Sequence, residues 1–308
     1  MIEASGLKKR YGRLLAVDGI GFRAEPGEVL GILGPNGAGK STTMKLIAGF
    51  LSPTEGSARV CGHDVQAEPM AARRALGYLP EGAPSYADMD PRGLLRFIAD
   101  LRGLRGEHRR QRLDFVISRL ALEPVLAQPV ETLSKGFRRR LGLALAIVHD
   151  PRALILDEPT DGLDPNQKHE VRGLITELSR ERSLLLSTHI LEEVEAVCTR
   201  AIIIARGRVL ADDTPAGLLA RSRYHNAVSL RPGDSIAARA ALDGMPGVSG
   251  FEQDERQARL FVFPQGKSLS AEAVADRLRQ RAVSFTELRR EPGRLDEVFR
   301  RITTQADA

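Results

Sequence analysis

Short runs of apolar residues recur along the chain, and segments with a helical pattern lie between them. The runs cover residues 28–33, 153–157, 183–188 and 201–205. The helical patterns cover residues 42–49, 168–179 and 192–197. Strands without polar alternation are typical of a parallel sheet whose two faces are covered by helices. The pattern therefore predicts an α/β core.

A different pattern opens the chain, because apolar and polar positions alternate over residues 1–30. This alternation predicts antiparallel strands, and Pro26-Gly27 ends them just before the first apolar run. Further strands are expected at residues 57–61 and 76–79. We expect the strands near the N-terminus to form an antiparallel β subdomain.

From about residue 83 to 150 the pattern becomes helical. We expect one helix to begin near Pro91, a second to cover residues 109–122 and a third to run over 137–149. In the first helix a single face is predicted to be buried, and it carries Leu94, Leu95, Phe97, Ile98 and Leu101. This stretch is a predicted helical insert in the α/β core.

The residues after Pro215 predict a second, smaller domain. Strands are expected at residues 228–230, 248–253, 260–263 and 284–289, and helices at 236–242, 269–279 and 295–302. The order β-α-β-β-α-β is that of a small α+β ferredoxin-like sandwich. We therefore divide the chain into residues 1–221 and 222–308, and we interpret the second part as an accessory packing or regulatory domain because it lacks a catalytic constellation.

Charge and composition add constraints on partners. The formal net charge is +5 and the isoelectric point is about 9.5. Arginine clusters at residues 138–140 and 109–110 can meet nucleic acid, anionic lipid or an acidic partner, or they can be solvated helix faces. For residues 109–110 we favour the solvated face. The absence of tryptophan and the few aromatics argue against a base-stacking surface, so no nucleic-acid partner is expected.

The cysteines and the apolar runs bear on the compartment. Cys61 and Cys198 are the two cysteines, and they have no C-x-x-C spacing. This argues for a reducing compartment and against a disulfide framework or a zinc site. The N-terminus lacks a secretory pattern, and no apolar run approaches the roughly 20 residues that cross a bilayer. If the protein works at a membrane, another chain must cross it.

One motif dominates the candidate chemistry, and it matches G-x-x-x-x-G-K-S/T at every fixed position. It consists of Gly34, Pro35, Asn36, Gly37, Ala38, Gly39, Lys40, Ser41 and Thr42. Glycines let backbone N–H groups approach an anion, lysine reaches outer phosphates, and the hydroxyl that follows it can ligate Mg²⁺. A predicted strand precedes the motif and a predicted helix follows it, which is the context of a phosphate-binding loop. The alternative is a glycine-rich turn that binds nothing.

Three further groups follow predicted strands or open a predicted helix. Asp157 and Glu158 end one apolar run, where a carboxylate can hold Mg²⁺ and its neighbour can activate water, although such a pair is often a solvated turn. His189 ends another run, where a structural hydrogen bond is the alternative. Ser134 and Gly136 open a long helix, and their residue types alone favour an ordinary N-cap over an anion site.

Together these motifs resemble those of the ATP-binding cassette (ABC) ATPases, over residues 1 to about 220. Residues 34–41 resemble the Walker A loop, 154–158 the Walker B strand, 133–137 the family signature and 158–164 the segment that runs into the D-loop. His189 matches the switch histidine. Tyr11 by itself is equally consistent with a core residue and with a ring that stacks on a base. In the resemblance it occupies the position of the aromatic residue that stacks on adenine.

The resemblance implies an α/β P-loop NTPase fold and a head-to-tail dimer. Each ATP is then held between Lys40 of one subunit and Ser134 and Gly136 of the other. A second anion site at Ser134 and Gly136 is then expected in addition to the first, because it serves the nucleotide of the partner. Asp164 of the D-loop is expected to couple the two sites.

The resemblance also assigns roles in hydrolysis. Glu158 is the implied general base, and His189 and Lys40 are the other catalytic candidates. Ser41, Asp157 and Glu81 are the implied ligands of Mg²⁺.

Three positions depart from the family pattern. Lys135 replaces the first glycine of the signature and Phe137 replaces the glutamine of the signature, while Ser134 and Gly136 match the family pattern. Glu81 stands where the family has the Q-loop glutamine, so that an oxygen ligand is kept and a charge is added.

A single cassette with Glu81 and a C-terminal extension is similar to the ATPase subunits of ABC-2-type bacterial exporters, and residues 295–299 resemble the tail common in them. This implies an ATPase that drives a separate ABC-2-type permease, with export as the expected direction, from a cytoplasmic, peripheral position on the inner face of the membrane. One rival is a soluble ABC ATPase acting on ribosomes or DNA. Those proteins usually carry two cassettes or a coiled coil, and this chain has neither. A second rival, a non-enzymatic interaction module, is opposed by the intact Lys40, Glu158 and His189.

Overall fold

The computed structural model describes residues 1–82, 86, 88–266 and 269–305. The chain forms two compact units, which are described separately. The first spans Met1–Pro215 and also includes the last residues from Thr303, and the second spans Ala216–Ile302. The predicted start of the helical insert at residue 83 and the chain end at 308 lie outside the described residues.

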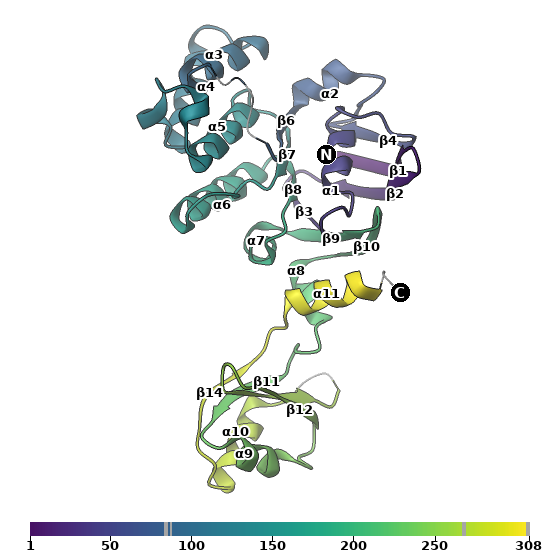
Figure 1. The fold of residues 1–308 in the computed structure, drawn as a ribbon, viewed down its shortest axis with the longest axis vertical. Helices are drawn as coiled ribbons and strands as arrows, with labels where there is room; N and C mark the ends of the chain where they lie inside the picture. The colour runs from purple at the N-terminus through teal and green to yellow at the C-terminus, as the bar shows by residue number, and fades with distance from the viewer. Residues whose placement is uncertain (83–85, 87, 267–268, 306–308) are drawn as a thin grey trace. The chain divides into compact units, whose positions relative to one another are not determined.

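A six-stranded sheet is the centre of the first unit, and Figure 1 shows it between two groups of elements. Its strand order is β10-β9-β3-β8-β7-β6. The strands are β3 (Val29–Leu33), β6 (Leu76–Leu79), β7 (Ala153–Asp157), β8 (Ser183–Ser187), β9 (Arg200–Ala205) and β10 (Arg208–Asp213). All are parallel except β10, which pairs antiparallel with β9. Every position of β3, β7 and β8 is buried, as expected for strands covered on both faces.

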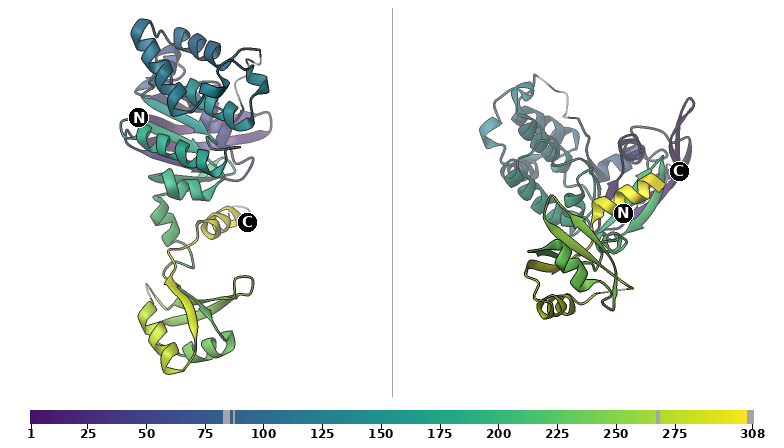
Figure 2. Two further views of the ribbon diagram at one scale, coloured as in Figure 1. Left: turned by 90° about the vertical axis from the view of Figure 1, so that its left-hand side faces the viewer. Right: turned by 60° about the horizontal axis from the view of Figure 1, so that its bottom comes forward.

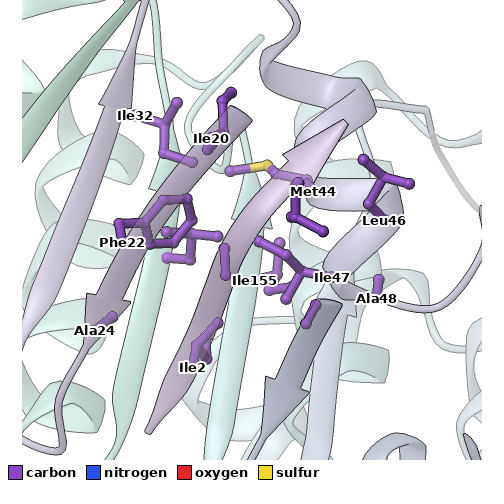
Figure 3. Close-up of a cluster of buried hydrophobic side chains, with 14 of the residues drawn as sticks. Ile2, Ile20, Phe22, Ala24, Ile32, Met44, Leu46, Ile47, Ala48 and Ile155 are labelled. Atoms are coloured by element: carbon purple, nitrogen blue, oxygen red, sulfur yellow. The ribbon is translucent and has the colours of Figure 1, made fainter. Parts of the chain in front are cut away.

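A four-stranded antiparallel sheet of order β2-β1-β4-β5 lies beside it. Its strands are β1 (Ile2–Tyr11), β2 (Leu14–Ala24), β4 (Glu55–Val60) and β5 (His63–Asp64). Helix α1 (Lys40–Ile47) contacts both sheets. Figure 3 shows the shared core, in which Ile20 and Phe22 of the antiparallel sheet, Met44 of α1, and Ile32 and Ile155 of the central sheet gather. Burial of this apolar surface fixes α1, and with it the loop of residues 34–39 that precedes it.

Helices cover the rest of the first unit (Figures 1 and 2). They are α2 (Pro69–Ala75), α3 (Pro91–Leu101), α4 (Gly106–Arg119), α5 (Lys135–Ile147), α6 (Pro165–Ser179) and α7 (Leu191–Val197), with two short 3₁₀ turns at Glu123–Val125 and Val130–Thr132. The predicted buried face of α3 is partly wrong. Leu94, Leu95 and Ala99 are buried, whereas Phe97 is exposed and Leu101 is 72% exposed.

The second unit contains a four-stranded antiparallel sheet of order β12-β13-β11-β14. Its strands are β11 (Val228–Pro232), β12 (Val248–Asp254), β13 (Arg259–Pro264) and β14 (Phe285–Arg290), and its helices are α8 (Pro215–Ala220), α9 (Ser235–Leu242), α10 (Ala271–Gln280) and α11 (Leu295–Gln305). Helices α9 and α10 share a core with the sheet. The chain order from β11 to β14 is the predicted β-α-β-β-α-β. In the described parts of the chain, none of the helices combines the length and hydropathy needed to cross a membrane.

Candidate active site

The sheet order brings the predicted polar motifs to one edge. Strands β3, β8 and β7 are neighbours and run parallel, so their carboxyl ends meet. The loop of residues 34–39 follows β3, His189 follows β8 and Glu158 follows β7. Glu81 follows β6, which is the next strand along. The carboxyl edge of a parallel sheet is where such folds bind ligands.

The loop after β3 has a backbone that requires glycine. Gly37 and Gly39 have φ values of 80° and 102°, which side chains rarely adopt. A side chain at Gly39 would also meet the Ala16 carbonyl oxygen, and one at Gly34 would meet that of Ile204. Helix α1 begins at Lys40, directly after Gly39, and no described side chain caps its N-terminus. The loop therefore leaves the first N–H groups of α1 for a ligand, and an anion suits them.

Lys40 is buried within this loop. Its Nζ donates hydrogen bonds to the carbonyl oxygens of Gly34 at 2.7 Å and Pro35 at 3.1 Å. Burial lowers the pKa of Lys40, while the carboxylates of Glu158 and Asp157 oppose that shift. A phosphate bound on the loop can replace the two carbonyl oxygens as the hydrogen-bond acceptor of the Lys40 ammonium group, because a charged acceptor makes a stronger hydrogen bond. Ser41 is the next residue on α1 and is half-buried.

Asp157 is the last residue of β7 and is only 2% exposed. Within the described ranges, no group donates a hydrogen bond to its Oδ2. Burial raises the pKa of this carboxyl group. A buried carboxylate oxygen without a partner is costly, and a bound cation would satisfy it. The residues present therefore fit a hard divalent ion near Ser41 and Asp157.

Glu158 and His189 form a pair at this edge. Glu158 Oε1 and His189 Nδ1 lie 2.8 Å apart. Glu158 has a φ of 52°, which is rare for a residue with a side chain, and its N–H donates to the Ser187 carbonyl oxygen at 2.9 Å. Strained backbone of this kind is found at functional sites. The Glu158 side chain is mostly buried, whereas that of His189 is 58% exposed, so the pair presents its imidazole to solvent.

Arg139 is a site residue that the sequence did not reveal. It lies on α5, and its guanidinium donates to the carbonyl oxygens of Glu158 and Pro80, the latter at 2.7 Å, and to that of Glu81 at 3.3 Å. Burial lowers the pKa of Arg139. From its sequence, the cluster at residues 138–140 is either a partner surface or a solvated helix face. Both interpretations are wrong for Arg139 and Arg140, which are buried.

The signature and D-loop residues lie at helix starts. Ser134 caps α5 by accepting from the Phe137 N–H at 3.2 Å, and Asp164 caps α6 by accepting from the Gln167 N–H at 2.9 Å. Gly136 is buried, and an added Cβ would lie 3.0 Å from Gln167 Oε1. Among described residues, no hydrogen bond or ion pair joins Ser134, Gly136 or Asp164 to the loop of residues 34–42.

Lys135 and Tyr11 are close to the surface. Lys135 pairs with Asp161 at 2.8 Å and packs over Gly162, so this departure from the signature links the start of α5 to the segment before the D-loop. Its hydrogen bond lowers the pKa of Asp161. Tyr11 ends β1 and is 44% exposed, and Lys9 Nζ lies 5.3 Å from its ring centroid. Tyr11 is therefore not a core residue.

Comparisons with known proteins agree with this site. A family model described as ABC transporter matches residues 17–161. Nod factor export ATP-binding protein I from Paraburkholderia xenovorans (strain LB400) is 35% identical over 303 residues, covering 98% of this chain and 96% of that protein. This chain belongs to the ABC transporter ATPases. The sequence-based prediction of the family, of its α/β P-loop NTPase fold and of ATPase activity is thereby confirmed.

Other relatives of this ABC ATPase match about 70% of its length. Probable multidrug ABC transporter ATP-binding protein YbhF from Escherichia coli (strain K12) is 36% identical over 223 residues, which are 72% of this chain and 38% of that protein. The structure of an ATP-binding subunit of an ABC transporter superposes with a TM-score of 0.67 at 31% identity, covering 71% of this chain and 91% of that one. A dimeric bacterial ABC transporter cassette has the same fold, with a TM-score of 0.64 at 22% identity over 70% of this chain and 99% of that one.

Proposed function

We propose that this chain is the ATP-hydrolysing subunit of an exporter whose permease is a separate ABC-2-type chain. The observation that carries the hydrolytic part is the sheet edge itself. A buried Lys40, the partnerless Oδ2 of Asp157 and the Glu158–His189 pair meet there beside the uncapped start of α1. A phosphate-binding loop, a cation ligand and a base are the parts that phosphoryl transfer to water requires.

The phosphates are proposed to lie on the N–H groups of residues 34–42, with Lys40 against the outer ones. Ser41 and Asp157 would hold Mg²⁺, with Glu81 as a further oxygen ligand. Bound Mg²⁺ supplies charge neutralisation at the phosphate oxygens. The exposed ring of Tyr11 is proposed to stack on the adenine.

Glu158 is proposed to accept the proton of the attacking water. Its Oε1 is already oriented by His189 Nδ1, and its backbone is held in one conformation by Arg139 and by the Ser187 carbonyl. A base that is fixed before the substrate arrives loses little entropy when it reacts. The exposed imidazole of His189 is proposed to contact the terminal phosphate.

The second anion site is proposed to act on a partner copy. Ser134 and Gly136 lie at the start of α5, and the nearest neighbours of Gly136 are Gln167, Gly162 and Leu163 rather than residues of the loop 34–42. A head-to-tail dimer would bring them to the nucleotide of the other subunit, together with Asp164. The dimeric form of the cassette that shares this fold supports such an arrangement.

A groove in the first unit supports a protein partner. It has a volume of about 760 Å³ and is lined mainly by apolar side chains of α2, α3 and α5 and of the segment after α1. Its exposed large side chains are Phe50, Met70, Tyr86 and Leu101. Arg73, Arg74 and Arg102 also line it. An apolar patch with a polar border is typical of a protein interface, and an amphipathic cytoplasmic helix of the permease fits it.

The relatives support export as the direction. The protein from Paraburkholderia xenovorans that matches almost the whole chain is named for Nod factor export. We propose that docking on the permease places this chain at the cytoplasmic face of the membrane. The rival role on ribosomes or DNA has no comparable support, since the relatives reported above are named as export or transporter proteins.

A Glu158→Gln variant tests the hydrolytic mechanism. It should bind ATP with the affinity of the wild type and lose about 100-fold or more in turnover, because the amide cannot accept a proton. It should also accumulate as a dimer when ATP and Mg²⁺ are present, measured by size-exclusion chromatography with light scattering. Glu192→Gln on the exposed face of α7 is the matched control. Turnover of Glu158→Gln at the wild-type rate would remove Glu158 from the reaction.

A further inference from the structure

A buried carboxylate that the proposed reaction does not use lies on α7. Glu193 is only 2% exposed, which is rare for a glutamate. Its Oε2 accepts a hydrogen bond from Thr188 Oγ1 at 2.7 Å, and its Oε1 accepts one from Thr160 Oγ1. Arg172 of α6 lies 3.9 Å from Oε1. The carboxylate therefore joins side chains from three other segments of the chain.

The two threonines belong to the two loops that carry the catalytic pair. Thr160 is two residues after Glu158, in the same tight turn, where the Asp161 N–H donates to the Glu158 carbonyl oxygen at 3.1 Å. Thr188 comes directly before His189. Glu193 is thus the side chain that bridges the Glu158 turn to the His189 loop.

The bridge continues to the other side of His189. Thr188 Oγ1 accepts from the Ile190 N–H at 3.0 Å, and the Glu193 N–H donates to the Ile190 carbonyl oxygen at 3.1 Å. Both neighbours of His189 are therefore tied to Glu193. Movement of the His189 backbone away from Glu158 would break several buried hydrogen bonds together.

We propose that Glu193 is a positioning residue, which sets the spacing between Glu158 and His189 by holding the Thr160 and Thr188 hydroxyls. The inference rests on the proposed roles of Glu158 and His189. Burial of a carboxylate is unfavourable, and an apolar side chain of similar volume would often be at least as stable here. A glutamate at this position is explained by its role in orienting Glu158 and His189. A displacement of about 1 Å in a catalytic group can lower the rate of an enzyme about 100-fold.

Steady-state ATPase assays of the full-length protein test this role. Glu193→Ala should lower kcat by about tenfold or more and change the KM for ATP by less than about threefold, because the phosphate-binding loop is untouched. Glu193→Gln keeps an acceptor for one threonine and can donate to the other, so kcat should return to within about threefold of the wild type. Glu192→Ala, on the exposed face of the same helix, is the control and should behave as the wild type.

A second variant covers the case in which Glu193→Ala does not fold. Thr160→Val keeps the shape of the buried side chain and removes the donor to Glu193. It should lower kcat by about fivefold with little change in KM, as expected for loss of orientation.

The outcomes separate this inference from the proposed function. A folded Glu193→Ala or Thr160→Val variant with the kcat of the wild type, measured alongside a slow Glu158→Gln, would overturn the role of Glu193 alone. Equal losses in Glu193→Ala and Glu193→Gln would overturn it too, since orientation should be recovered by the amide. If Glu158→Gln turned over normally, the proposed role of Glu158 would fall, and this inference with it.

Discussion

Single residues in this site are held mostly by main-chain oxygens. Lys40 is bound by two loop carbonyls, and the guanidinium of Arg139 is bound by three carbonyls from two different loops. Arg139 therefore ties the segment after β6, which contains Glu81, to the turn that contains Glu158. A planar fork with five donors is suited to such a role, and lysine cannot replace it fully.

Arg139→Ala should lower the free energy of unfolding by about 2 kcal/mol, because the part-buried carbonyl oxygens at residues 80, 81 and 158 lose their donor. Arg139→Lys should recover only part of this loss. The free energy of unfolding is measured by urea denaturation followed by circular dichroism. Arg138→Ala is the control on the same helix, since Arg138 is less buried. Equal stability of Arg139→Ala and Arg138→Ala would show that the guanidinium does not hold the two loops.

At the scale of elements, the contact between the end of α5 and β6 depends on a neutral histidine. His149 Nε2 lies 3.1 Å from the Leu76 carbonyl oxygen. Nδ1 is buried, and it has no partner in the described part of the chain. Burial lowers the pKa of His149 to about 4, and the nearby Arg102 adds to the shift. Protonation of this ring is thus disfavoured while the unit is folded.

The stability of the first unit should therefore depend on pH through His149. The pKa is about 6.5 in the unfolded chain and lower in the fold, so the unfolded state binds more protons below pH 6.5. Stability from this residue is complete above about pH 6.5 and is lost as the pH falls towards 4. Between pH 7.5 and 5 the wild type should lose about 2 kcal/mol more than His149→Gln does. Urea unfolding at several pH values measures this difference, with His108→Gln on the surface of α4 as the control. Parallel pH curves for the wild type and His149→Gln would contradict it.

Continuous apolar strands were the most predictable elements. Residues 153–157 and 76–79 form β7 and β6 as predicted, because nothing but a buried strand suits such short apolar runs between turns. Helix α2 and edge strand β10 were not predicted. The first is one short segment, Pro69–Ala75, without a clear apolar period, and the second alternates weakly over Arg208–Asp213.

Side-chain environments were harder to predict than elements. Phe97 and Leu101 have the spacing of a buried helix face, yet both are exposed, and Leu101 lines an open groove. Arg139 and Glu193 have the opposite character, since charged residues on helices usually face water and these two are buried. Only the folded chain shows which carbonyl or hydroxyl groups satisfy them. The loop of residues 34–39 could be placed between a strand and a helix from the sequence, because the residue types of its motif are required together.

At the scale of the whole molecule, each unit has its own apolar core. The core of the first unit extends from Ile2 to Ile204, and that of the second from Val228 to Leu278. The compact units divide after Pro215, whereas the sequence pattern placed the limit after residue 221. All proposed nucleotide-binding residues, from Tyr11 to His189, precede both limits. The first unit is therefore expected to bind ATP without the second.

Calorimetric titration with ATP, in the presence of Mg²⁺ and then of EDTA, shows whether the nucleotide binds on the loop of residues 34–42. The full chain and a chain ending at Pro215 should bind ATP with Mg²⁺ to within about threefold of each other. Lys40→Met, which keeps the apolar stem of the side chain, should bind at least about tenfold more weakly, because it lacks the charge that faces the outer phosphates. Chelation of Mg²⁺ should weaken binding to the wild type. If a folded Lys40→Met bound ATP as tightly as the wild type, or if the wild type showed no Mg²⁺-dependent affinity, the nucleotide would not lie on the loop of residues 34–42.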